Sequence, residues 1–435
     1  MKFFSSWYSQ TAFGLPLVLL VFGCGGADNS TVSMRDGGSD GSTDSEVPAD
    51  SGDPNATGPI GGPLVGEAAD DRFGTAVAIS ADGSRVVIGA KLNDGGGDAG
   101  AERGHARVFE RDGDGWVQLG QDLDGEADGD RSGSAVAISN DGLRVAIGAP
   151  LNDGNGNQSG QVRVFDLDGD TWTQVGEDID GGRVGDQFGA SLALSADGDR
   201  IIVGAPLANE VTGRAYVLDL VGGSWTQVGD FITSDHETGF AVAISDDGGR
   251  IAVSAPFPQS SDAYPGRVTV YDEDNGDWVT VGSALVGVEN SEGFGASLAF
   301  SADGETLAIG ATTADGGGNN SGTVRVYSLA DSPFVQIGDD MDGPVGVQLG
   351  TSVSLSADGT RLIAGGSASA NSTARLYVLS GDSWDEQTNP EFPVGRETGT
   401  SVAISPDGHT IAVASTLAGP ASSSNRGEVQ LYQLK

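Results

Sequence analysis

The chain has 435 residues, of which 71 are glycine, and its 62 acidic residues outnumber 22 basic ones to give a net charge of −40. A surface of that sign repels phosphate, so the composition excludes a nucleic-acid partner. The single cysteine leaves no partner for an internal disulfide. Repeat folds of this length often form one unit, so the length does not require several domains.

Residues 1–23 have the pattern of an export signal. Lys2 provides a positive start, and residues 12–22 form an apolar run too short to span a bilayer. The run ends in Val21-Phe22-Gly23-Cys24, which resembles the lipobox of bacterial lipoproteins and implies acylation of Cys24. Gly25, in place of aspartate, implies export to the outer membrane or cell surface. The alternative is an ordinary cleaved signal with an incidental cysteine.

Residues 24–57 are predicted to be a disordered acidic tether. They consist largely of Ser, Asp, Gly, Thr and Pro, with almost no large apolar side chains to offset the entropy of ordering. The tether would hold a folded domain, residues 58–435, away from the membrane, which the protein would contact through its lipid anchor only.

One pattern then recurs about every 50 residues, which is typical of a propeller or a solenoid. Its marker is Ser-x-Asp-Gly, and the marker aspartates are Asp82, Asp141, Asp197, Asp247, Asp303, Asp358 and Asp407. The second copy contains four short runs rich in Val and Ile, at 134–139, 144–150, 161–165 and 172–176, separated by turn residues. Four strands make one blade, so the sequence predicts an all-β, seven-bladed propeller of four-stranded antiparallel blades.

Two further patterns concern the contacts between blades. An aromatic residue begins the fourth strand of most copies, and a row of this kind favours blade-to-blade packing over a sugar platform. The row consists of Trp116, Trp172, Trp225, Trp278, Phe334 and Trp384. The last copy lacks a fourth strand, but residues 59–74 align without gaps to 118–133. We therefore predict that an N-terminal strand near 57–66 completes the last blade and closes the ring.

At these residues the sequence resembles the FG-GAP repeat family, which includes the propeller of integrin α subunits. Phe-Gly occurs at 73–74, 188–189 and 294–295, and Gly-Ala-Pro occurs at 148–150 and 204–206. The Phe-Gly glycine is present in all seven copies, as a crowded or positive-φ position requires. The resemblance implies the fold and leaves the function open. The calcium loops of integrin repeats do not carry over, because Ser-x-Asp-Gly offers a single aspartate there.

Two sets of residues are candidates for binding. Asp166, Asp168 and Asp170 alternate in a turn between third and fourth strands and could offer carboxylate oxygens to Ca²⁺, although solvated turns are the simpler interpretation. The loops between second and third strands recur on one rim of the ring and are the expected partner surface. The candidate residues there are Asn93, Asp94, Asn152, Asp153 and Asp315.

The sequence offers little for catalysis. His105, His236 and His409 fall at unrelated positions of different copies, and no Gly-x-Ser-x-Gly elbow occurs. We therefore expect a monomeric, non-enzymatic module that binds an extracellular protein or polysaccharide, for adhesion or envelope scaffolding. One alternative is a propeller enzyme, such as a polysaccharide lyase or glycosidase, with carboxylates at the central channel. Another is a structural component of a surface layer.

Overall fold

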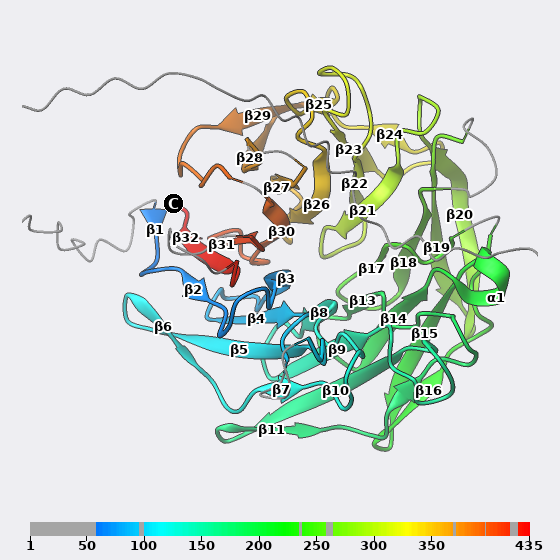
Figure 1. Ribbon diagram of the computed structural model, residues 1–435. Coiled ribbons are helices and arrows are strands. Elements are labelled where there is room, and N and C mark those ends of the chain that lie inside the picture. Colours follow the sequence, from blue (N-terminus) through cyan, green and yellow to red (C-terminus); the bar gives the residue numbers. More distant parts are fainter. Residues whose placement is uncertain are drawn as a thin grey trace, which may run out of the picture. The chain divides into compact units, whose positions relative to one another are not determined.

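The computed structural model describes residues 58–94, 100–234, 237–257, 264–368, 371–395, 397–417 and 425–435 (Figure 1). The described residues fall within one compact unit, Gly52–Lys435. The predicted signal peptide, Cys24 and the tether lie outside them, as does His236.

The unit contains seven antiparallel sheets in a ring, so the predicted seven-bladed propeller is confirmed. In each blade the first strand faces the centre and the fourth lies outermost. Blade 1 consists of β3 (Phe73–Ile79), β4 (Arg85–Ala90), β5 (His105–Asp112) and β6 (Gly115–Gln118). Blade 2 consists of β8 (Ala135–Ile138), β9 (Arg144–Ala149), β10 (Gln161–Asp168) and β11 (Thr171–Gln174). Blade 3 consists of β13 (Ser191–Leu194), β14 (Arg200–Ala205), β15 (Arg214–Val221) and β16 (Ser224–Gln227).

The remaining blades repeat this plan. Blade 4 consists of β17 (Val242–Ile244), β18 (Arg250–Ala255), β19 (Arg267–Asp274) and β20 (Asp277–Val286). Blade 5 consists of β21 (Phe294–Phe300), β22 (Thr306–Ala311), β23 (Thr323–Ser328) and β24 (Val335–Gln336). Blade 6 consists of β26 (Leu349–Leu355), β27 (Arg361–Gly366), β28 (Ala374–Ser380) and β29 (Ser383–Gln387). Blade 7 consists of β30 (Thr398–Ile404), β31 (Thr410–Ser415), β32 (Glu428–Gln433) and β1 (Gly58–Pro59).

Short segments extend four of the blades. The two-residue strands β7 (Leu123–Asp124), β12 (Ile179–Asp180), β25 (Met341–Asp342) and β2 (Leu64–Val65) each pair with the third strand of their blade. One short helix, α1 (Ala208–Val211), occurs in the described part of the chain. No helix among these residues is long and apolar enough to cross a membrane.

The N-terminal strand closes the ring as predicted. Gly58 and Pro59 of β1 pair with Gln433 and Tyr432 of β32, and β2 pairs with the same strand nearer its start. The amide of Ile60 donates to the carbonyl oxygen of Leu431 at 2.8 Å, and the Ile60 side chain is buried. Blade 7 therefore joins the two ends of the domain, and its third strand is not left as an open edge.

The second strand of every blade is the most buried, because a neighbouring blade covers each of its faces. In β4, β9, β14, β18, β22 and β27 every residue after the first is buried. This burial explains the nearly continuous Val, Ile and Ala content of these strands, since a strand covered on both faces does not alternate. The core is therefore a set of apolar layers between adjacent blades.

The glycines of the Phe-Gly and Gly-Ala-Pro motifs meet across the blade interfaces. Gly148 belongs to the second strand of blade 2 and Gly189 precedes the first strand of blade 3. A Cβ added to Gly148 would lie 2.1 Å from the carbonyl oxygen of Gly189, and Gly189 itself has φ of 86°. The same close approach recurs for the pairs Gly89/Gly133, Gly204/Gly239, Gly310/Gly350 and Gly365/Gly399. The repeat motif thus encodes backbone contact between blades.

The Ser-x-Asp-Gly turns form a closed ring of backbone hydrogen bonds. Each turn donates an amide to a carbonyl oxygen of the next blade's turn, at 2.8 to 3.2 Å. The donor-to-acceptor pairs are Ala81–Asn140, Asn140–Ala196, Ala196–Asp246, Asp246–Ala302, Ala302–Ala357, Ala357–Pro406 and Asp407–Ala81. Pro406 has no N–H, so the neighbouring Asp407 amide completes the ring.

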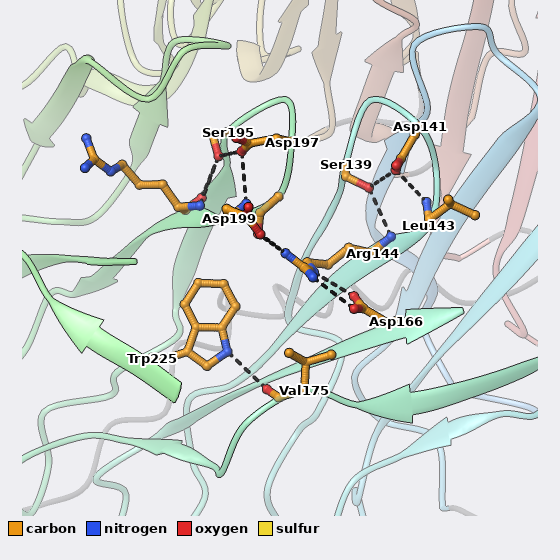
Figure 2. A network of polar contacts seen from close by, with 12 residues as sticks. Ser139, Asp141, Leu143, Arg144, Asp166, Val175, Ser195, Asp197, Asp199 and Trp225 are labelled. Carbon is orange, nitrogen blue, oxygen red and sulfur yellow. Dashed lines mark hydrogen bonds and ion pairs between the residues drawn. The ribbon is translucent and has the colours of Figure 1, made fainter. Parts of the chain in front are cut away.

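Side chains fix each turn and join it to the next blade (Figure 2). The Asp141 carboxylate accepts hydrogen bonds from the Ser139 hydroxyl at 2.6 Å and the Leu143 amide at 2.9 Å. Arg144 binds Asp166 of its own blade through two hydrogen bonds and also reaches Asp199 of blade 3. Both ion pairs lie at the blade interface. The pair with Asp166 is bidentate, because two guanidinium N–H groups point at the two oxygens of one carboxylate.

The aromatic row also lies between blades, as predicted. The Trp225 Nε1 donates to the carbonyl oxygen of Val175, in the preceding blade, at 3.1 Å (Figure 2). Trp172, Trp278 and Trp384 make the same bond to Leu119, Val228 and Ile337. Their indole nitrogens are therefore engaged inside the interface rather than presented to a ligand.

Candidate functional site

Antiparallel blades place their connections on two opposite faces. The first-to-second and third-to-fourth hairpins lie on one face, and the second-to-third and fourth-to-first connections lie on the other. We call the second of these the loop face. It includes residues 91–94 and 100–104 and connections 150–160 and 312–322 between second and third strands, and connections 66–72, 125–131 and 343–348 between blades.

The two asparagines predicted to contact a partner are buried in these loops. Asn93 is 4% exposed and Asn152 is 5% exposed. The Asn93 amide donates to the Asp71 carboxylate at 3.2 Å, and the Asn152 amide donates to the Asp130 carboxylate at 3.0 Å. Asp71 and Asp130 belong to the fourth-to-first connections, so these asparagines hold adjacent loops together and do not form the outer surface.

The three aspartates predicted in the same loops have more access to solvent. Asp153 accepts the Gln158 amide at 2.8 Å, and Asp315 accepts the Asn320 amide at 2.7 Å, while both side chains remain exposed. Asp94 is half-buried and accepts the amides of Gly100 and Glu102. Each aspartate shapes its loop, and Asp153 and Asp315 also present charge on the loop face.

The calcium candidates lie on the opposite face, and the structure does not bring them together. Both oxygens of Asp166 accept hydrogen bonds from Arg144, at 2.6 and 2.9 Å. Asp168 and Asp170 are exposed in the turn. Within the described residues, the side chains that could converge on one ion are instead Glu67, His105 and Asp122. The prediction of calcium at the turn gains no support from this geometry.

Exposed valines recur in the fourth-to-first connections of the loop face. Val184, Val288, Val345 and Val394 are 65 to 77% exposed, in the connections after blades 2, 4, 5 and 6. Three of them stand five residues before the Phe-Gly glycine of the next blade, and Val288 stands seven residues before it. Val184 and Val345 lie directly against Gly156 and Gly318 of the adjacent loops, where a Cβ would be 2.7 and 2.6 Å from the valine methyl groups. Single exposed apolar residues are common, but a repeated set on one face is typical of an interaction surface.

A cluster of three cations occupies the loop face where blades 7, 1 and 2 meet. Lys91 follows β4, and Arg72 and Arg131 precede the first strands of blades 1 and 2. Arg72 pairs with Glu397, and Arg131 pairs with Glu102 at 2.6 Å. No hydrogen bond or ion pair holds the Lys91 ammonium in the part of the chain that the structure describes. We call these five residues the cationic cluster.

The electrostatics of the cationic cluster favour a negatively charged ligand. Burial lowers the pKa of Lys91, and the neighbouring charges of Arg131 and Arg72 lower it further. Three cations face two carboxylates, so one positive charge lacks a counter-ion. An anionic group placed beside Lys91 would relieve the repulsion between the three cations. Perturbed lysines of this kind are concentrated at functional sites.

Sequence reasoning missed the cationic cluster, although one signal was present. The chain has three lysines, and Lys91 is the one between Lys2 and Lys435. It occupies the place of the proline in Gly-Ala-Pro, where other copies carry Pro150, Pro206 or Thr312. A lone lysine at a repeat position that is otherwise proline or a small hydroxyl residue is a departure from the pattern that could have been noticed.

The central channel is lined by the first strands of all seven blades and has a volume of about 500 Å³. Its wall consists of small and apolar residues such as Ala76, Ala135, Ser297 and Ser352, with Asn140 and Pro406 at one end. None of the described residues that line it carries a carboxylate. The arrangement anticipated for a channel enzyme, two facing carboxylates, is therefore not found there.

Comparisons with known proteins agree with the fold. The family model described as FG-GAP repeat matches residues 66–109 and 123–165, so the chain carries FG-GAP repeats. No curated protein matches the sequence. The solved structure of hydrazine synthase from Kuenenia stuttgartiensis is similar, with a TM-score of 0.55 and 16% identity over 86% of this chain and 98% of that chain. At that identity the likeness concerns the fold alone.

Proposed function

Since the chain carries FG-GAP repeats in a closed seven-bladed propeller, we propose that it is a non-enzymatic binding module that holds another exported protein on its loop face. In this proposal Cys24 anchors the chain by a lipid at the outer membrane or cell surface, and residues 24–57 serve as the tether. The role is adhesion or scaffolding of the envelope.

The repeated exposed valines are the observation that carries the proposal. A protein partner can cover Val184, Val288, Val345 and Val394 together, which removes apolar surface from water. The packing of Val184 and Val345 against loop glycines holds these side chains in place before binding, which lowers the entropic cost of association.

The cationic cluster adds a requirement on the partner's charge. The surface of the whole protein is strongly acidic, so Lys91, Arg72 and Arg131 are a local exception to its repulsion of anions. A carboxylate of the partner would be attracted to Lys91, whereas the acidic remainder of this protein's surface would repel it. The proposed partner therefore presents an acidic group beside an apolar surface.

A polysaccharide-cleaving enzyme with its site in the channel is the weaker proposal, because the channel wall of the described residues contains no carboxylate pair. A polysaccharide that is bound but not cleaved would contact the cationic cluster and would cover few of the exposed valines. The two kinds of ligand can therefore be separated by substitutions at these two places.

The test uses the full chain and host envelope proteins, with chemical cross-linking and identification of the partner. Lys91→Thr installs the residue found at Thr312 in blade 5, and Val345→Asp places a charge on the apolar set. Both substitutions are expected to reduce capture of one partner at least tenfold. Val221→Asp is the control, since Val221 is 62% exposed but belongs to a hairpin on the opposite face. A partner retained by Val345→Asp, or lost in Val221→Asp, would contradict the proposed face.

A further inference from the structure

We call residues 58–72, which contain β1 and β2, the closing segment. Three side chains that could bind a metal ion converge where this segment meets blade 1. Glu67 follows β2 in the closing segment, His105 begins β5, and Asp122 precedes β7. One carboxylate oxygen of each acid and one imidazole nitrogen all lie within 4.8 Å of one another. The group therefore joins the N-terminal end of the folded unit to the first complete blade.

His105 is the unusual member of this group. Its side chain is 1% exposed, and neither ring nitrogen has a hydrogen-bond partner. The Oδ1 of Asp124 is 3.8 Å from Nδ1, which is too long for a hydrogen bond. A buried polar group without a partner costs free energy, so an unsatisfied imidazole among carboxylates requires an explanation.

In blade 2 the same repeat position is occupied by Gln161, whose side chain forms hydrogen bonds with other protein groups. Gln161 pairs with Asp180 across β10 and β12, as His105 pairs with Asp124 across β5 and β7. The Gln161 amide donates to Glu126 at 3.0 Å and to Asp180 at 3.3 Å. In blade 5 the Thr323 hydroxyl donates to Asp342. The imidazole of blade 1 makes neither kind of bond.

We propose that His105, Glu67 and Asp122 bind a divalent ion of the zinc class. Imidazole nitrogen with carboxylate oxygen is a ligand set that Zn²⁺ accepts, whereas Ca²⁺ and Mg²⁺ require oxygen ligands. A neutral imidazole and two carboxylates offset the charge of a divalent ion. The ion would tie Glu67 of the closing segment to His105 and Asp122 of blade 1, and so would reinforce the closure of the ring.

The surroundings of the site are compatible with this ion. Zinc ligands lie about 2.0 to 2.2 Å from the metal, so the three side chains must draw together from their present separation. Glu67 is exposed, and Asp122 is half-buried and accepts a hydrogen bond from the exposed Gln118 side chain at 2.6 Å, so both acids can move without disturbing the core. Arg107 lies 3.7 Å from one oxygen of Glu67, but it is held by the Val65 carbonyl oxygen and the Phe73 ring. The second Glu67 oxygen is left for the ion.

The experiment titrates the full chain with Zn²⁺ by calorimetry and follows thermal unfolding with and without the ion. One His105-dependent zinc ion is expected to bind, and unfolding is expected to shift up by about 3 °C when free zinc is about 100 times Kd. Ca²⁺ and Mg²⁺ at the same concentration are expected to leave the midpoint unchanged. The same titration with Co²⁺ is expected to give visible d–d absorption bands of cobalt coordinated by imidazole nitrogen and carboxylate oxygen.

The matched variants are His105→Gln, which installs the residue of blade 2, and His409→Gln, which removes an exposed histidine elsewhere. His105→Gln is expected to weaken zinc binding at least tenfold and to abolish the thermal shift, while His409→Gln retains both. All variants keep Cys24, so binding by that thiol would persist equally in each. Should His105→Gln fail to fold, the exposed substitution Glu67→Gln replaces it, with the same expected loss. Equal zinc binding by wild type and variant, or a midpoint that rises with Ca²⁺ alone, would overturn the assignment.

Discussion

Gly148 and Gly189 belong to adjacent blades, and a Cβ on Gly148 would lie 2.1 Å from the carbonyl oxygen of Gly189. That oxygen is part of the backbone and cannot turn away as a flexible side chain could. Gly148→Ala is therefore expected to push the two blades apart and to lower the free energy of unfolding by about 2 to 3 kcal/mol. Urea denaturation of the full chain measures the change.

Gly169 provides the control for this substitution. Unlike Gly148, it has a positive φ, 63°, and no atom lies within 4 Å of the position of its Cβ. Gly169→Ala is therefore expected to cost about 1 to 2 kcal/mol from backbone conformation alone. Because φ of Gly148 is not positive, its cost arises from the contact with Gly189, and a cost near zero for Gly148→Ala would show that close approach of the blades is unimportant there.

Trp225 contributes both a ring and a hydrogen bond to its interface. Its Nε1 donates to the Val175 carbonyl oxygen, and Phe334 occupies the corresponding place between blades 4 and 5 without such a donor. Trp225→Phe is expected to cost about 1 kcal/mol, the value of one hydrogen bond, whereas Trp225→Ala also removes packing and is expected to cost about 3 kcal/mol. Chemical denaturation distinguishes them, and equal costs would mean that the ring adds little.

The blade count and the closing strand could be predicted because they depend on local patterns that repeat. The turn marker around Asp141 requires a serine two residues before it, which the structure explains by the Ser139 hydrogen bond. The alignment of residues 59–74 with 118–133 likewise revealed the fourth strand of blade 7. The function of the Phe-Gly glycine could be predicted as crowding, but its partner Gly148 could be identified only in the structure.

The parts of the site that escaped prediction depend on loops distant in sequence. Asn152 is followed by Asp and Gly, a pattern typical of a surface loop. Its side-chain amide nevertheless donates a hydrogen bond to Asp130, which precedes blade 2. Lys91 lies near Arg131 and Glu397 because the ring brings blade 7 next to blade 1. The asparagine–aspartate contact recurs as Asn93–Asp71 in blade 1, so its residues are repeated, but their pairing across loops is visible only in the structure. Lys91 occurs in a single copy of the repeat, so no repeat pattern encodes its contacts.

The Asp246 carboxyl group is expected to lower the free energy of unfolding as pH rises. Burial raises the pKa of Asp246, against the hydrogen bond that it accepts from Asn140. The folded state therefore binds a proton more readily than the unfolded state, so ionisation of Asp246 costs stability at neutral pH, and that cost disappears as pH falls. Asp246→Asn is expected to stabilise the protein by less than about 1 kcal/mol at pH 7 and to have no effect near pH 3.5.

The adjacent Asp247 is the control of opposite sign. Hydrogen bonds from the Ser245 hydroxyl and the Gly249 amide lower the pKa of Asp247. Its ionised form therefore contributes stability above the ordinary aspartate pKa, and this contribution is lost as pH falls through the folded value. Asp247→Asn is expected to destabilise at pH 7. Thermal midpoints of both variants between pH 3.5 and 7 provide the measurement, and changes of the same sign would contradict the assignment.

The closing segment is expected to determine whether the ring holds together. Deletion of residues 58–65 removes β1 and β2, the buried Ile60 side chain and its hydrogen bond to Leu431. The third strand of blade 7, β32, then becomes an open edge, and an open edge pairs with other chains. We expect a lower unfolding midpoint and concentration-dependent association, measured by calorimetry and by light scattering after size exclusion. A deletion of equal length within the predicted tether, residues 40–47, should change neither property. An unaltered midpoint after deletion of 58–65 would mean that blade 7 is stable with three strands, and that closure depends instead on the hydrogen-bond ring of the turns, where the Asp407 amide meets the Ala81 carbonyl oxygen.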